Sequence, residues 1–292
     1  MPIVPMREIL KDANEKSYAV GSYNAYDLTL VRGILQAAEQ ENSPVILAHA
    51  PVHFKYTNLE SVANIMVYEA RKTRVPVALL LDHGYDVDTC IKAMGLGFNA
   101  VMMDASKHPL EKNIEMVSSV VNIAHKSGCD VEGEIGYVTR PISGKDEGDD
   151  DDSMIDDTSL YTNPEDAVKF ISRTKADALA VAFGTAHGIY LKKPILDIKR
   201  LAAINNLVNG VPLVMHGGSG LSNLDITNSI ENGIRKINYY TGMAISTAES
   251  TKEYLDGIKD QVFYHNLMMK AIDSVTSDIA KSMRLFGSSG KA

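Results

Sequence analysis

The sequence has few of the features that mark secreted, membrane or nucleic-acid-binding proteins. Only two of its 292 residues are cysteines, Cys90 and Cys129, too few for a disulfide framework or a thiolate zinc site. No apolar run approaches the roughly 20 residues that span a bilayer, so we expect no membrane as a partner. No signal peptide opens the sequence, and a reducing cytoplasm is the simplest setting.

The formal net charge of −8 arises from a single stretch of the chain. Residues 146–157 contain eight of the 37 acidic residues, and the other acids equal the 29 lysines and arginines in number. The sequence therefore shows no basic face, which argues against nucleic acid as a partner.

Two patterns alternate along the chain. Eight short apolar runs bounded by turn residues are typical of buried strands, and helical patterns separate them. The expected strands are Ala19–Tyr23, Pro44–His49, Pro76–Asp82, Asn99–Asp104, Asp130–Ile135, Asp177–Phe183, Val211–His216 and Ile234–Asn238. Apolar strands that alternate with helices predict a parallel sheet closed into an α/β (β/α)₈ TIM barrel, a single domain over residues 1–292.

An open, doubly wound sheet is the alternative fold. No GxGxxG motif follows the first strand to support a dinucleotide-binding domain. The segment from about Phe263 to Leu285 is left over after eight units, and we expect a helix there that packs on the barrel or on a neighbouring subunit.

Three of the eight histidines fall at the ends of expected strands. His83 follows the third strand, His187 lies in the turn after the sixth, His216 ends the seventh, and His49 lies near the end of the second. The carboxyl ends of barrel strands form one rim, where the chemistry of such folds takes place. Imidazoles on a rigid rim suit Zn²⁺ with an open coordination position. The other four histidines lie in expected loops or helices and are interpreted as incidental, namely His53, His108, His125 and His265.

Carboxylates end strands on the same rim. Asp82 immediately precedes His83, and successive strand residues face opposite sides, so both should not point inward unless the strand ends there. Glu132 and Glu134 are two residues apart and share one face. For Asp104 and Glu134 two roles stay open, namely direct contact with a metal and orientation of a metal-binding histidine.

A glycine-rich turn, HGGSGLS, follows the seventh strand from His216 to Ser222. Gly217 and its neighbouring glycines can adopt backbone angles closed to other residues and let a ligand approach the main chain. Ser222 is typical of a helix N-cap, where free N–H groups attract anions. A candidate metal ligand thus lies beside a candidate phosphate site.

The acidic stretch is too long for an ordinary connection between a strand and a helix. Such charge runs are usually solvated, but long loops at the catalytic end of a barrel are often lids. Glu147 is the only glutamate of this loop and is therefore its candidate acid or base.

Five motifs resemble the class II, zinc-dependent ketose-bisphosphate aldolases, a family that includes the fructose- and tagatose-bisphosphate enzymes. They are LLLDHG, VEGEIG, GTAHGIY, VPLVMHGGSGLS and KIN, in this order, and the resemblance covers the whole chain. It implies a lyase that forms dihydroxyacetone phosphate and an aldehyde from a sugar phosphate, with zinc on His83, His187 and His216. It also implies a homodimer or homotetramer.

The resemblance further assigns roles to single residues. Asp82 becomes the carboxylate that works on the C4 hydroxyl, Glu134 lies near the metal, and Asp104 belongs to an alternative metal site. Glu147 is assigned the exchange of the C3 proton, although the loop that carries it is altered and lengthened here. The substrate- and phosphate-binding residues, with a monovalent cation (Na⁺ or K⁺) beside the phosphate, become Asn24, Gly188, Gly217, Ser219, Asn238 and Thr241.

The chemistry agrees with these roles. Retro-aldol cleavage leaves an enediolate, whose charge a divalent ion stabilises, so no lysine Schiff base is needed.

Two positions depart from the fructose-bisphosphate enzymes of that family. Tyr240 stands where those enzymes place an acid, and Ala244 stands where they can carry an arginine for the far phosphate. An alternative substrate is therefore a ketose 1-phosphate whose far end is bound in another manner. The tagatose-type enzymes of the family also lack this acid, so the tagatose bisphosphate remains a candidate substrate for this chain.

Two other functions are alternatives to the aldolase. A metal-dependent hydrolase on the same barrel would usually need a histidine pair at the first strand, where Tyr23–Tyr26 offers none. A non-catalytic barrel that binds a sugar phosphate or supports a partner enzyme could lose Asp82 or one of the three histidines. The chain keeps all four groups, which disfavours that function.

Overall fold

In a computed structural model, which describes residues 2–139, 158–190 and 193–292, eight parallel strands close into a barrel. The strands pair in sequence order, and the last pairs with the first. They are β1 (Val20–Asn24), β2 (Val45–His49), β3 (Val77–Gly84), β4 (Ala100–Met103), β5 (Asp130–Ile135), β6 (Ala178–Val181), β7 (Leu213–Met215) and β8 (Ile234–Asn238). The predicted (β/α)₈ barrel is confirmed, and the open sheet is not formed.

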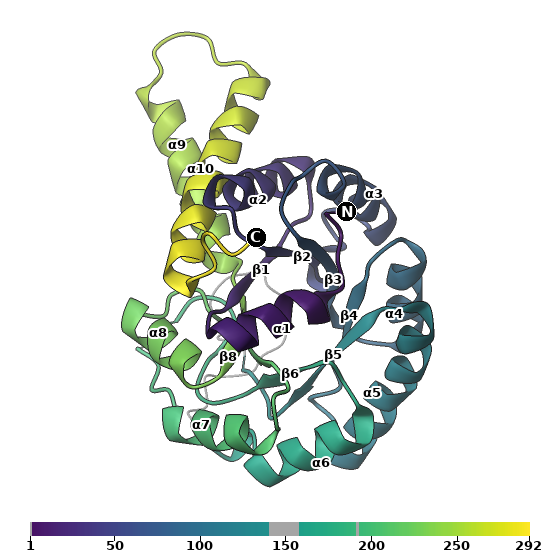
Figure 1. The fold of residues 1–292 in the computed structure, drawn as a ribbon. Helices are drawn as coiled ribbons and strands as arrows, with labels where there is room; N and C mark the ends of the chain where they lie inside the picture. Colours follow the sequence, from purple (N-terminus) through teal and green to yellow (C-terminus); the bar gives the residue numbers. More distant parts are fainter. Residues whose placement is uncertain (1, 140–157, 191–192) are drawn as a thin grey trace.

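Helices surround the barrel and connect its strands (Figure 1). They are α2 (Leu28–Glu41), α3 (Leu59–Ala70), α4 (Val87–Gly95), α5 (Leu110–Ala124), α6 (Pro164–Thr174), α7 (Ile198–Leu207), α8 (Asn223–Glu231), α9 (Thr241–Gly257) and α10 (Tyr264–Phe286), with short 3-10 turns η1 (Pro51–His53), η2 (His125–Ser127) and η3 (Thr158–Leu160). Several begin at side-chain caps; for example, Asp27 accepts a hydrogen bond from the Leu30 N–H at the start of α2. Within the described ranges, no helix is long and apolar enough to cross a membrane.

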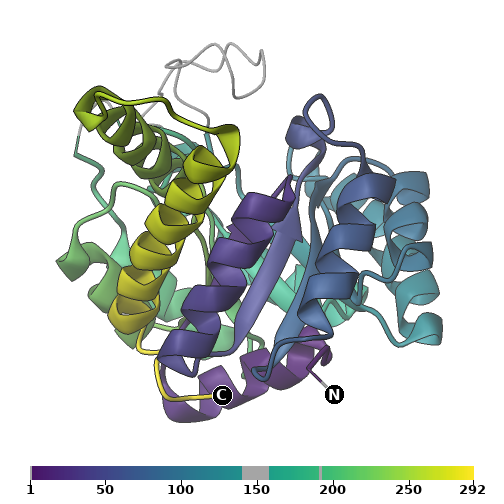
Figure 2. The same cartoon turned by 90° about the horizontal axis from the view of Figure 1, so that it is seen from above.

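The barrel interior changes from apolar to polar along the strands. Near the amino ends, small and aliphatic residues such as Val20, Ile46 and Ala78 pack together with the N-terminal helix α1 (Met6–Lys16). That helix crosses the amino-end opening of the barrel (Figures 1 and 2). Towards the carboxyl ends the inward-facing residues are polar and buried, namely Asp82, Glu132, Glu134, Lys236 and Asn238. A closed floor thus supports a polar layer at the carboxyl rim.

The C-terminal helix α10 packs along α2 and also contacts β1 and α9. The expectation that this segment packs on the barrel is confirmed. Helix α9 and the first turns of α10 extend beyond the barrel (Figure 1). Phe263, Tyr264 and Met269 are exposed on this extension.

Candidate active site

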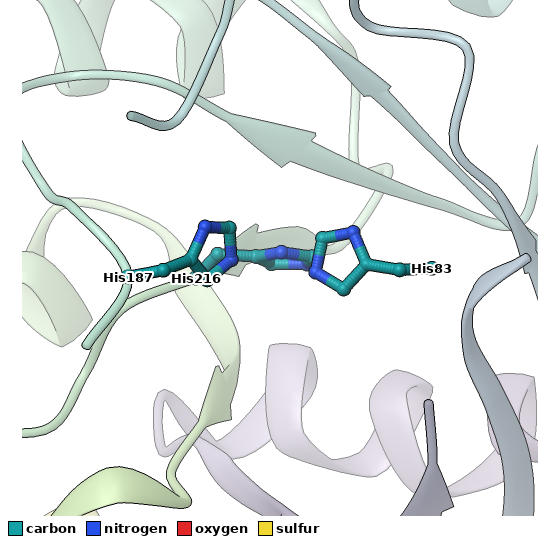
Figure 3. Close-up of side chains that lie close together, drawn as sticks. All are labelled: His83, His187 and His216. Carbon is teal, nitrogen blue, oxygen red and sulfur yellow. The ribbon is translucent and has the colours of Figure 1, made fainter. Parts of the chain in front are cut away.

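The three predicted zinc ligands meet at the carboxyl rim. His83 comes from β3, His187 from the segment after β6 and His216 from the residue after β7. Their imidazole rings converge (Figure 3), with centroids 4.6 to 5.5 Å apart. One nitrogen of each ring lies within 4.8 Å of the other two. This donor set suits one ion of the size and nitrogen preference of zinc.

The backbone of His83 explains how two consecutive residues serve one site. Its φ of 52° is left-handed, and the pairing of β3 with β4 shifts register between Leu81 and Gly84. This break in the strand suspends the usual alternation of side chains. Asp82 can therefore face the interior while His83 turns towards the other two histidines.

Asp104 fixes the orientation of the His83 ring. The distance between His83 Nδ1 and Asp104 Oδ2 is 2.8 Å, which leaves Nε2 as the nitrogen available to a metal. Burial opposes a charge on this ring, but Asp82 and Asp104 outweigh it and raise the pKa of His83 to about 9. The pocket thus favours a cation at this position.

The buried carboxylate of Glu132 contacts the His216 ring and fixes its orientation. Its Nε2 lies 3.0 Å from Glu132 Oε1, while its Nδ1 is buried with no hydrogen-bond partner among the described residues. Oε2 of Glu134 is likewise without such a partner and lies 3.5 Å from that Nδ1. Burial, followed by the charge of Asp104, raises the pKa of Glu134 to about 8. Buried donor atoms without partners are costly, and a metal ion would satisfy them.

Glu132 is itself paired with a buried lysine. Lys236 Nζ lies 2.9 Å from Glu132 Oε2 and donates a 2.6 Å hydrogen bond to Asn238 Oδ1. Both charged side chains are completely buried. No role is predicted for Lys236 from the sequence alone. Its position two residues before Asn238 on β8 is the signal that could have placed it inside the barrel.

Asp82 is buried and held by two asparagines. Asn24 Nδ2 donates to its Oδ2 at 2.8 Å, and Asn238 Nδ2 donates to its Oδ1 at 3.0 Å. Burial opposes ionisation of Asp82, but the charges of His83 and Lys236 and the bond from Asn24 outweigh it and lower its pKa. An ionised, oriented carboxylate therefore lies next to the histidine cluster and can act as a base. The substrate-binding roles predicted for Asn24 and Asn238 stay predictions.

The loops after β6, β7 and β8 lie close together, as a phosphate cradle requires. Gly217 has a φ of 70°, and a Cβ there would lie 2.1 Å from the Ala186 carbonyl oxygen, so only glycine fits. The Tyr190 hydroxyl donates to Gly217 O at 2.8 Å and accepts from the Ala186 N–H at 2.9 Å. Ser219 Oγ accepts from the Gly242 N–H at 3.1 Å, in the first turn of α9.

The other predicted residues of this region fall at the same loops. Gly188 follows His187 with a φ of 81°, and Thr241 is the first residue of α9. Ser222 caps α8, as expected, by accepting a hydrogen bond from the Asp225 N–H. Glu147 lies outside the described residues.

A ring cluster borders the site at the ends of β8, β1 and β2. The rings of Tyr26, Tyr56 and Tyr240 and of His49 surround His53, whose centroid lies 4.6 Å from that of Tyr240. His53, interpreted from the sequence as incidental, is only 4% exposed. No local pattern marks it, because its neighbours come from three separate strand ends.

The comparisons with known proteins agree over the full chain. The model of the family described as "Fructose-bisphosphate aldolase class-II" matches residues 4–291. Among curated relatives, the "Probable fructose-bisphosphate aldolase" of Bacillus subtilis (strain 168) is 39% identical and the fructose-bisphosphate aldolase of Staphylococcus epidermidis is 36% identical, each alignment covering 100% of both chains. The crystal structure of the YdjI aldolase from Escherichia coli K12 is 32% identical, covers 99% of each chain and has a TM-score of 0.86. The predicted resemblance is confirmed: the chain belongs to the class II fructose-bisphosphate aldolase family.

Proposed function

We propose that this aldolase reversibly cleaves a ketose phosphate into dihydroxyacetone phosphate and an aldehyde, with zinc held by His83, His187 and His216. The observation that carries the proposal is the convergence of three imidazoles beside a buried, ionised carboxylate. A divalent ion bound there supplies Lewis-acid stabilisation of the negative charge that develops on the ketose oxygens. Glu134 and Asp104 lie close enough to serve as further or alternative ligands, because they form a second donor group with His83.

Asp82 is assigned the proton transfer. Its carboxylate accepts the proton of the C4 hydroxyl as the C3–C4 bond breaks, and the electron pair of that bond remains on the ketone half. In the reverse direction it returns the proton to the new hydroxyl. The hydrogen bonds from Asn24 and Asn238 fix the carboxylate in one orientation for both directions. Glu147 remains the predicted group for exchange of the C3 proton.

The ketone half is assigned to the loops around Gly188, Gly217, Ser219 and Thr241. Backbone N–H groups at these turns and at the start of α9 suit a phosphate. An anchored phosphate aligns the bond to be broken with Asp82. The monovalent cation expected beside the phosphate belongs to this same assignment.

Two possibilities exist for the end of the substrate away from the ketone, which either carries a second phosphate or does not. The names of the relatives favour a fructose bisphosphate. Tyr240 and Ala244, which stand where the resemblance to fructose-bisphosphate enzymes implies an acid and an arginine, favour a ketose 1-phosphate with an unphosphorylated far end. Tyr240 belongs to the ring cluster around His53, to which it contributes an aromatic surface and not a charged group.

Steady-state kinetics decides between these substrates and tests the activity itself. The purified protein is assayed for release of dihydroxyacetone phosphate from fructose 1,6-bisphosphate, tagatose 1,6-bisphosphate and their 1-phosphates, before and after chelation and after zinc is restored. We expect zinc-dependent cleavage with the highest kcat/KM on a 1-phosphate. A clear preference for fructose 1,6-bisphosphate would refute the substrate, and bound metal without any cleavage would refute the activity.

The proposal includes the oligomeric state of the protein and its location in the cell. The exposed apolar residues Phe263, Tyr264 and Met269 on the extension formed by α9 and α10 support association of identical chains into a homodimer or homotetramer. Sedimentation velocity measures this directly. A cytoplasmic setting agrees with the two buried, free cysteines.

A further inference from the structure

His53 differs from the histidine beside it in what its ring can still bind. Both nitrogens of His49 face backbone carbonyls, with Nδ1 2.8 Å from Ala25 O and Nε2 3.3 Å from Thr57 O. His49 thus holds the loop after β2 in place. Nδ1 of His53 is equally buried, yet it has no hydrogen-bond partner among the described residues.

A buried nitrogen of this kind destabilises the folded protein unless a bound group supplies the missing hydrogen bond. A buried polar atom without a hydrogen bond costs free energy, and each one in a folded protein calls for an explanation. The unpartnered atoms of Glu134 and His216 face the proposed metal. His53 belongs to no group of metal-binding side chains in the described ranges, so a metal does not explain its Nδ1.

The surroundings of His53 point to the substrate instead. The His53 ring lies 4.6 Å, centroid to centroid, from the ring of Tyr240, which is two residues after the Asn238 that donates a hydrogen bond to Asp82, the proposed base. Asn24, which donates a hydrogen bond to Asp82, has a buried Oδ1 that also has no partner within the described part of the chain. Burial, followed by the nearby His49, lowers the pKa of His53 to about 4, so the ring is neutral at pH 7. A neutral ring nitrogen and an amide oxygen suit hydroxyl groups, which both donate and accept, better than they suit a phosphate.

We propose that Nδ1 of His53 hydrogen-bonds a hydroxyl group of the aldehyde half of the substrate, and that His53 is thereby a specificity-determining residue for hydroxylated aldehydes. The inference rests on the proposed aldolase activity. It specifies which class of aldehyde the aldolase accepts, namely aldehydes that carry hydroxyl groups.

The test uses aldol addition of dihydroxyacetone phosphate to two three-carbon aldehydes, glyceraldehyde with two hydroxyls and propanal with none. In His53→Phe the ring volume remains but the nitrogen is lost. We expect kcat/KM for glyceraldehyde to fall roughly tenfold, the loss expected for one hydrogen bond, while the value for propanal changes by less than about twofold. His53→Asn places an amide near the position of Nδ1 and should restore most of the preference. His125→Phe, at the opposite end of the barrel, is the control and should leave the ratio unchanged.

Three results would overturn the inference. An equal loss on both aldehydes would assign His53 a structural role, and wild-type kcat/KM for both aldehydes in both His53 variants would remove it from substrate contact. A wild-type protein that neither adds dihydroxyacetone phosphate to an aldehyde nor cleaves a ketose phosphate would instead refute the proposed function, and this inference with it.

Discussion

Asp82 and His83 are consecutive residues of β3, yet both side chains reach the same site, because His83 has a left-handed backbone. Asp82 accepts hydrogen bonds from Asn24 and Asn238 inside the barrel, and His83 turns to His187 and His216. A φ of 52° costs a residue with a side chain about 1 to 2 kcal/mol. Strain of this kind at a proposed metal ligand suggests that the geometry of the site maintains it.

Two substitutions separate the proposed ligand role of His83 from its backbone strain. His83→Ala and His83→Gly both remove the imidazole, and we expect both to lose stoichiometric zinc by elemental analysis. Only glycine relieves the left-handed conformation, so with metal removed the Gly variant should be more stable than the Ala variant by about 1 kcal/mol in urea unfolding. Equal stability would show that the conformation is not strained.

Removal of the Asp104 carboxylate should weaken zinc binding without removing a histidine. Asp104 fixes the ring of His83 through a 2.8 Å contact to Nδ1, and loss of such an orienting partner typically weakens metal affinity about 10- to 100-fold. We expect Asp104→Ala to bind zinc with an affinity lowered by about this factor, measured in competition titrations with a chromogenic chelator. Ser106→Ala removes only a hydroxyl that donates to Asp104 Oδ1 and is the matched control, with a smaller loss. Unchanged affinity in Asp104→Ala would contradict the orienting role.

The barrel and its three histidines could be predicted from the sequence because their signals are local. Each strand is a short apolar run; His83 and His216 lie at the end of one or directly after it, and His187 lies in the segment that follows another. Since the carboxyl ends of parallel strands share one rim, locating the strands also locates His83, His187 and His216.

The groups behind the ligands could not be predicted in this way. Lys236 and Glu132 are 104 residues apart, and the pair between them exists only because the closed barrel turns both inward. Alternation along β5 and β8 gives the face of each residue but not its partner across the interior. The left-handed φ of His83 has no sequence signal either, because the residue is not a glycine.

Lys236 should stabilise the barrel through the acid it neutralises. Lys236→Met leaves Glu132 buried beside His216 without its cationic partner, and breaking a buried pair typically costs about 3 to 5 kcal/mol. We expect a loss of this size in the urea-derived free energy of unfolding. The double variant Lys236→Met/Glu132→Gln removes the unpaired charge and should recover a large part of it. A double variant no more stable than the single one would show that the charge is not the cause.

Gly217 is predicted to control the position of His187 through its backbone. A Cβ at Gly217 would meet the carbonyl oxygen and carbon of Ala186 at 2.1 and 2.6 Å, so alanine must displace the residue next to His187. Gly210 is the matched control, because its φ of 86° is also left-handed but a Cβ there meets nothing within 4 Å. Both alanine variants should lose about 1 kcal/mol of stability from backbone strain. Gly217→Ala alone should also lose zinc affinity and aldol cleavage, as measured by chelator competition and dihydroxyacetone phosphate release. Wild-type zinc affinity in Gly217→Ala would show that the two loops adjust independently, and would refute the coupling between the turn after β7 and the ligand after β6.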